Sequence, residues 1–222
     1  MDNRSIYTNL ETGRRVYLRP IRPHDSSRLR EGIAQMSDTS RYFRFFSGMR
    51  QVPDSVLEKL VDVDGESHLG WVALDLGAHD LPVIGAVRVV RNPVSGAGEL
   101  AIATLDAFHN TGLARILIAT IVSDCRRVGI DRLYADTLAE NKKARSLLRA
   151  IGGKASPSDG AYVKYTFDTA EMDALLRGME APRGIADVHA AFDRFAASAA
   201  VRQSATCAPA PMQVVTPFQR PV

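Results

Sequence analysis

The chain has 222 residues, 45% of them apolar and 24% charged, a composition that buries one sizeable core and makes two domains crowded. Its 28 Lys and Arg face 25 Asp and Glu, and because the small basic surplus forms no run, the charge gives no case for nucleic acid. Residues 1–22 hold no apolar leader and the longest apolar run, residues 116–122, is too short for a bilayer, so we expect a cytoplasmic protein without a membrane span.

The first third of the chain predicts one strand followed by helices. Residues 16–21 alternate apolar and polar side chains, which is typical of a strand, and residues 23–25 form a turn and a helix cap. Apolar side chains at helical spacing over residues 29–36 predict a first helix, and the aromatic cluster at 42–46 predicts a second. Residues 53–61 form a third short helix with a proline near its first turn.

The middle of the chain has the pattern of an antiparallel meander. Residues 69–76, 82–91 and 99–105 are short runs rich in Val, Ile and Ala, which predict three strands. Residues 77–80 and 95–98 separate them and have turn compositions.

The pattern then alternates between helix and strand. Residues 111–128 carry one apolar face at helical spacing and precede Gly129, which ends the helix. Residues 130–138 predict a strand, Asn141 caps a helix that reaches Ala150, and residues 162–167 close the sheet. We therefore expect an α/β sandwich.

The residues after this domain differ in composition. Residues 171–178 and 185–197 are helical in pattern, and the remainder is rich in Ala, Pro, Ser and Gln. We expect the main domain at 14–168, a helical extension at 169–198 that packs on the domain or on a partner, and a flexible tail at 199–222.

The most informative segment runs from Glu99 to Arg115, where a strand enters a glycine turn and a helix begins. Several backbone N–H groups at such a helix start have no helical partner, so they and the helix dipole favour anionic oxygens such as those of a pyrophosphate. Gly112 and the small Ala114 let the phosphates approach the backbone. Taken alone, an ordinary connection between strand and helix explains the segment equally well.

The turn His109-Asn110-Thr111-Gly112-Leu113-Ala114 resembles the acetyl-CoA motif of the GNAT acetyltransferase family, Gln/Arg-x-x-Gly-x-Gly/Ala, and the resemblance covers residues 16–167. It implies a mixed, mostly antiparallel sheet flanked by helices, and acetyl-CoA as acyl donor. His109 departs from the usual Gln or Arg, and Gly153 from the usual Phe. The residues implied to hold acetyl-CoA are Ile102, Ala103, Thr104, His109, Asn110, Thr111, Gly112, Leu113, Ala114, Arg115 and Asn141.

A narrower resemblance concerns the acceptor side. The aromatic run of residues 40–47 and the strand Glu99-Leu100-Ala101 are similar to bacterial Pat-type protein lysine acetyltransferases, in which the Glu is the proposed general base. Core packing explains an aromatic cluster at this spacing at least as well. The resemblance implies that Glu99 is catalytic, and its partial burial beside Ala101 and Ala103 is expected to raise its basicity.

A general acid is harder to assign. Many GNAT relatives carry a Tyr on the helix after Asn141, where this chain has Leu148. Tyr134 on the preceding strand is a possible substitute, although a Tyr in a strand more often only packs.

Other chemistries find little support. The histidines and the two cysteines, Cys125 and Cys207, lack metal-ligand spacing, so we expect no metal, and neither a P-loop nor a GxGxxG after a strand is present. The leading hypothesis is an N-acetyltransferase acting on a protein lysine. A small-amine N-acetyltransferase and a non-catalytic acyl-CoA sensor remain alternatives, and the chain is either a monomer or a homodimer.

Overall fold

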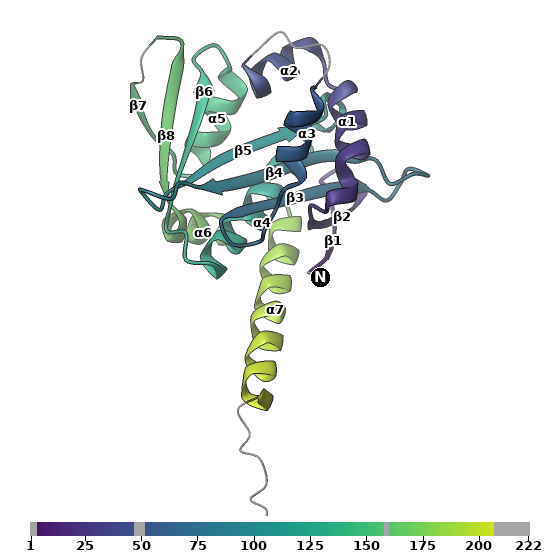
Figure 1. The fold of residues 1–222 in the computed structure, drawn as a ribbon, viewed down its shortest axis with the longest axis vertical. Coiled ribbons are helices and arrows are strands. Elements are labelled where there is room, and N and C mark those ends of the chain that lie inside the picture. The colour runs from purple at the N-terminus through teal and green to yellow at the C-terminus, as the bar shows by residue number, and fades with distance from the viewer. Residues whose placement is uncertain (1–3, 47–51, 158–159, 207–222) are drawn as a thin grey trace, which may run out of the picture.

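The structure is a computed structural model that describes residues 4–46, 52–157 and 160–206 (Figure 1). The strands are β1 (Ile6–Asn9), β2 (Arg15–Pro20), β3 (His68–Asp75), β4 (Val83–Arg91), β5 (Gly98–Thr104), β6 (Arg132–Leu138), β7 (Lys154–Pro157) and β8 (Tyr162–Asp168). The helices are α1 (Ser26–Ala34), α2 (Asp38–Phe45), α3 (Asp54–Val61), α4 (Leu113–Arg127), α5 (Lys142–Ala150), α6 (Thr169–Arg177) and α7 (Gly184–Thr206). Strands β1 and β7 are additions to the predicted set.

The strands form one mixed, mostly antiparallel sheet in the order β1-β2-β3-β4-β5-β6-β8-β7. The exception is β5 and β6, which run parallel and pair only at Gly98↔Leu133 and Glu99↔Tyr134. Beyond Glu99 the two strands diverge, so the rest of β5 has one unpaired edge. This confirms the predicted fold class and opens the centre of the sheet.

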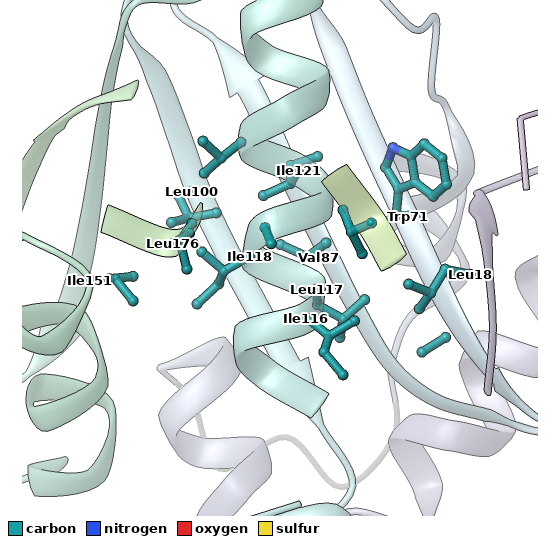
Figure 2. Close-up of a cluster of buried hydrophobic side chains, with 14 of the residues drawn as sticks. Leu18, Trp71, Val87, Leu100, Ile116, Leu117, Ile118, Ile121, Ile151 and Leu176 are labelled. Carbon is teal, nitrogen blue, oxygen red and sulfur yellow. The ribbon is translucent and has the colours of Figure 1, made fainter. Parts of the chain in front are cut away.

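The main core lies between the sheet and α4, the most deeply buried helix. Ile116, Leu117, Ile118 and Ile121 of α4 are all fully buried, and Val87 of β4 packs in the same cluster (Figure 2). Burying each such side chain is worth about 1.5–3 kcal/mol relative to leaving it exposed. This burial fixes the position of α4 and therefore of its N-terminus.

The opposite face of the sheet is covered only in part. Helices α1 and α3 pack a second apolar cluster, including Leu29, Leu57 and Val72, over the side of the sheet that holds β2, β3 and β4. Because strand side chains alternate between faces, Arg88 points away from α4 while its neighbours Val87 and Val89 are buried on the α4 side. This face therefore carries polar side chains on the central strands.

Helices α6 and α7 complete the core on the α4 side. Ile185 and Val188 of α7 are buried there, and the ring of Phe192 lies 5.7 Å from that of Trp71. After Phe195 the helix leaves the domain, and Figure 1 shows α7 projecting away from the sheet. The helix is longer than the predicted 185–197, and residues 207–222 of the predicted tail lie outside the described residues.

Candidate active site

The turn before α4 requires glycine for two reasons. Gly112 has φ of 85°, a left-handed conformation that side chains other than glycine rarely adopt. A Cβ added at Gly112 would also stand 2.6 Å from Cβ of Pro182, which precedes α7. The turn is therefore held tightly between the domain and the C-terminal segment.

The start of α4 offers a row of free backbone donors. The first backbone bond of this helix runs from the Ile116 N–H to the Gly112 carbonyl at 3.1 Å. Within the described part of the chain, the N–H groups of residues 112–115 have no hydrogen-bond acceptor outside the helix. Together with the helix dipole, these donors form a site that suits the oxygens of a pyrophosphate.

A cavity of about 780 Å³ opens in front of these donors. Among the residues implied to hold acetyl-CoA, those lining it are Ile102, Ala103, Thr104, His109, Asn110, Gly112, Leu113, Ala114, Arg115 and Asn141. Thr111 is the exception, because its hydroxyl donates to the Phe108 carbonyl oxygen at 2.7 Å and its side chain is buried. The structure therefore brings all the others together around one space.

The cavity is basic at its α4 and α5 side. Arg115, Lys142 and Lys143 line it, and the buried Nε of Arg115 has no hydrogen-bond partner in the described structure. An unpaired buried donor favours an anionic ligand. Lys142 and Lys143 were not predicted, although their position directly after the predicted cap Asn141 was a usable signal. Asn141 does cap α5, since its side-chain oxygen accepts from Ala144 N–H at 3.0 Å.

Helix α2 forms the other wall of the cavity and is tied to it by Asp106. This carboxylate accepts from the Ser37 N–H at 3.0 Å, from the Ser37 hydroxyl at 2.9 Å and from the Ser40 hydroxyl at 2.7 Å. Burial alone would raise the pKa of Asp106, but these hydrogen bonds outweigh it and lower the pKa to about 2. This contact was not predicted, because it joins residues far apart in the chain.

The unpaired edge of β5 faces into the same space. The Leu105 N–H bonds to the Ile84 carbonyl at 2.9 Å, so alternate N–H groups toward Ala103 and Ala101 point to β4. Those of Ile102 and Thr104 consequently point to the open edge beyond the β5–β6 pairing. They are donors in a position to bind a ligand that lies along β5.

Glu99 lies where β5 and β6 part, at the end of the open wedge. Its side chain is exposed, so the expected partial burial is wrong: among the described residues, the apolar cluster under α1 and α3 includes no residue of β5. Arg44 of α2 and Arg88 of β4 both interact electrostatically with its carboxylate. Glu99 itself is absent from the lining of the cavity, which reaches Arg44.

Tyr134 is the direct partner of Glu99 on β6. Burial first, then the charges of Glu99 and Asp136 and hydrogen bonding to Glu99, raise the pKa of the Tyr134 phenol, which keeps its proton. Lys164 of β8 lies 4.7 Å from the centre of its ring and 3.5 Å from Asp136. Tyr134 is therefore a protonated donor beside a carboxylate.

The two departures on and after α5 have structural explanations. Leu148, at the position of the family's acid, is 5% exposed and belongs to the main core. A Cβ at Gly153 would stand 2.6 Å from the Leu148 carbonyl oxygen and 2.7 Å from Cε1 of Phe167. Phe167 of β8 thus supplies an aromatic ring beside Gly153, and no side chain fits at that position.

Exposed aromatic side chains lie on α2 and at the start of β8, where Tyr162 pairs with Leu138 at the end of β6. Phe46, which follows α2, contacts Tyr162 of β8 edge to face with ring centres 5.3 Å apart. Both rings are about 40% exposed, as is Tyr42 at 39%. Only part of the aromatic run therefore belongs to the core, because Phe45 packs inward whereas Tyr42 and Phe46 are exposed.

Two general features concern the whole described chain. None of the helices within residues 4–46, 52–157 and 160–206 combines the length and hydropathy needed to cross a membrane. Across the same residues, no group of three or more metal-ligating side chains comes together.

Comparison with known proteins identifies similar chains. A family model described as acetyltransferase (GNAT) domain matches residues 15–154. An acetyltransferase of Pseudomonas aeruginosa is 30% identical over 157 residues, which cover 70% of this chain and 84% of the relative. Acetyltransferase Pat of Mycolicibacterium smegmatis is 29% identical over 171 residues, covering 77% of this chain but only 50% of that protein.

Solved structures that resemble this chain are also acetyltransferases. The GNAT domain of S. lividans PAT superposes with a TM-score of 0.69 at 25% identity, covering 76% of this chain and 98% of that domain. A spermidine N-acetyltransferase from Vibrio cholerae, solved with CoA and spermine, has a TM-score of 0.56 at 16% identity, which shows a shared fold. It covers 71% of this chain and 97% of that structure.

Proposed function

The chain belongs to the GNAT family and is an acetyl-CoA-dependent N-acetyltransferase, and from that premise we propose that its acceptor is the side chain of a protein lysine. The observation that carries the proposal is that the Glu99 side chain is exposed and lies outside the lining of the donor cavity, while exposed aromatic rings lie on α2 and β8. A folded or extended polypeptide reaches such a surface, whereas a small polyamine is usually held in a deep acidic pocket. The relatives named Pat agree with this choice.

We assign donor binding to the 780 Å³ cavity. The free N–H groups of residues 112–115, with Arg115, Lys142 and Lys143, would hold the phosphates. The N–H groups of Ile102 and Thr104 would hold the chain that runs along β5 toward Glu99. When bound, acetyl-CoA supplies an acetyl group activated as a thioester.

Glu99 would act as the base. An ammonium has no lone pair, so the lysine must lose a proton before its nitrogen forms a bond to the acetyl carbon as the carbon–sulfur bond breaks. Glu99 takes that proton, directly or through a water molecule. Backbone N–H groups on the open edge of β5 stabilise the developing oxyanion.

The leaving thiolate needs a proton as well. Tyr134 holds its proton, since its pKa is raised, and lies beside Glu99, so it is the side chain best placed to supply it. Leu148 has no proton to give. The attacking nitrogen loses its second proton to water as the amide forms, and Tyr134 regains its proton from that water.

The test is release of free CoA from acetyl-CoA, measured for the wild type and Glu99→Gln across acetylatable proteins and small amines. We expect turnover with protein acceptors, lowered by Glu99→Gln about 10²-fold or more while acetyl-CoA binding is kept. Turnover with small amines alone would replace the protein acceptor. Binding without turnover of any acceptor, unchanged by Glu99→Gln, would make the chain an acyl-CoA sensor.

A further inference from the structure

The surroundings of Glu99 are unusual in carrying more positive than negative charge. Arg88 and Glu99 lie on one face of the sheet, on neighbouring strands, because Arg88 pairs with Ala101 and Glu99 with Val90. Arg44 approaches both from α2. The two guanidinium groups therefore flank the carboxylate that we assign as base.

Glu99 is the anionic group whose charge acts on Arg44, and the same carboxylate also acts on Arg88. The Arg44 guanidinium lies over the Phe45 ring at 5.2 Å, and no ion pair or hydrogen bond of its side chain occurs in the described part of the chain. Arg44 also lines the donor cavity, at the end nearest Glu99. Burial first, and then the charge of Arg88, lower the pKa of Arg44 to about 10, which leaves it a cation at neutral pH.

Arg88 is held in place by groups that leave its charge uncompensated. One of its nitrogens donates to the Lys59 carbonyl oxygen at 3.1 Å and lies 2.6 Å from Nε2 of His68. Burial and the charge of Arg88 lower the pKa of His68, which favours its neutral form. Neither contact brings a negative charge.

Asp62 and Asp64 act on His68, whereas the anion that acts on the two arginines is Glu99. Lys164 lies 3.5 Å from Asp136, which neutralises that pair. Glu99 is then shared between Arg44 and Arg88, so one positive charge is left over beside the proposed base. A second amine of a polycation would be repelled here, while a carboxylate would be attracted.

We propose that Arg44 and Arg88 form a carboxylate subsite next to Glu99, and that the enzyme selects lysines flanked by an aspartate or a glutamate. This inference rests on the proposed function, because it presumes a peptide acceptor. The subsite lies beside Glu99 and reaches the donor cavity through Arg44, where the residues beside the reacting lysine would lie. It makes Arg44 a residue that determines specificity.

The experiment compares synthetic peptides that share one sequence and one lysine and differ only in the residues on either side of that lysine, which are Asp, Asn or Arg. We expect wild-type kcat/KM for the Asp peptide to exceed that for the Asn peptide about tenfold, with the Arg peptide lowest. Arg44→Gln should reduce the Asp-to-Asn ratio below about threefold, and Arg88→Gln should reduce it as well. Arg44→Lys, which keeps the charge, should retain a preference for Asp.

Arg194→Gln is the matched control, since Arg194 is an exposed arginine of α7. It should leave the ratio at its wild-type value. Thermal unfolding of each variant shows whether it is folded. If folded Arg44→Gln loses kcat/KM equally on all three peptides, the subsite is overturned. The subsite is also overturned if the Arg peptide is the best substrate of the wild type.

Two further outcomes separate this inference from its premise. In the first, Arg44→Gln changes the ratio of succinyl-CoA to acetyl-CoA turnover but leaves the Asp-to-Asn ratio of the peptides unchanged. The carboxylate that Arg44 binds would then belong to the acyl donor, and this outcome would overturn the acceptor subsite. If acetyl-CoA binds but none of the peptides or proteins is acetylated, the proposed function itself fails.

Discussion

Glu99 and Tyr134 stand opposite each other as the last residue pair that holds β5 and β6 together before the strands part. The phenol keeps its proton, because burial and the neighbouring carboxylates raise its pKa. Tyr134→Phe should lower kcat about tenfold, since it removes the proton donor and leaves the ring, and should change KM for acetyl-CoA little. Steady-state kinetics, with the concentrations of both substrates varied, measure kcat and KM separately.

The control for this variant is Tyr7→Phe on the edge strand β1, where the ring is 60% exposed. Its kcat should match the wild type. If Tyr134→Phe also matches the wild type, the proton of the leaving group comes from solvent.

Gly112→Ala should weaken acetyl-CoA binding at least tenfold and destabilise the protein by about 1–2 kcal/mol. The methyl group meets Pro182 and strains a backbone with φ of 85°, so the donor N–H groups shift. Isothermal titration with CoA and urea unfolding measure the two effects. Gly96→Ala is the control, because Gly96 has φ of 69° but nothing within 4 Å of an added Cβ.

Gly96→Ala should cost similar backbone strain without affecting CoA affinity. Equal affinities for Gly112→Ala and the wild type would contradict the role of the turn.

Asp106→Ala should raise KM for acetyl-CoA several-fold and cost about 1 kcal/mol of stability, because α2 loses its tie to the cavity through Ser37 and Ser40. The folded pKa of Asp106, about 2, lies below the ordinary 3.8. Its contribution is therefore complete above the ordinary value and is lost as the pH falls through about 2. Kinetics near neutral pH and acid unfolding curves measure both.

Asp54→Ala removes another exposed carboxylate, one that pairs with Arg30 away from the cavity. It should leave KM unchanged. A normal KM in Asp106→Ala would show that α2 keeps its position without this tie.

His189 should make the stability of the fold depend on pH near neutrality. It is buried on α7, with Nε2 3.2 Å from Asp173, and burial first and then Arg177 lower its pKa below 6.5. The unfolded chain takes up this proton at a higher pH than the folded one, so stability is complete above about pH 6.5 and falls as the pH drops. His189→Gln should flatten this slope in urea unfolding between about pH 5 and 7.5.

His79→Gln is the control, since His79 is exposed. It should keep the wild-type slope, and an unchanged slope in His189→Gln would assign the pH dependence to other groups.

Much of the fold follows from local patterns in the sequence. The helix predicted over residues 111–128, the meander and the Asn141 cap all rest on neighbours in the chain, and the structure has each of them, with α4 at Leu113–Arg127. The edge strand β1 was missed because its IYTN sequence is only 4 residues long and becomes a strand through pairing with β2. Strand β7, also 4 residues, depends in the same way on β8.

The sequence pointed to candidate residues on both sides of the site: the turn at residues 109–114 on the donor side, and Glu99 with Tyr134 on the acceptor side. The surroundings of Glu99, in contrast, are assembled from α2, β4, β5, β6 and β8. No sequence pattern states that Arg44 and Arg88 meet Glu99, or that Tyr134 is its partner, because the register of these strands is set by the whole sheet. The exposure of Glu99 follows from the incomplete helical cover of that face, which is also a property of the assembled fold.

The open edge of β5 also sets the distance that the donor spans. In the proposed binding mode, the donor follows β5 from Thr104 to Glu99, a rise of about 17 Å at a strand's usual spacing. Because β5 is paired along its whole length with β4, this distance cannot stretch or shrink. A donor with a longer acyl group would carry its reacting carbonyl to the same point and push the surplus into the acceptor space, so the length of one strand limits which acyl groups leave room for a lysine.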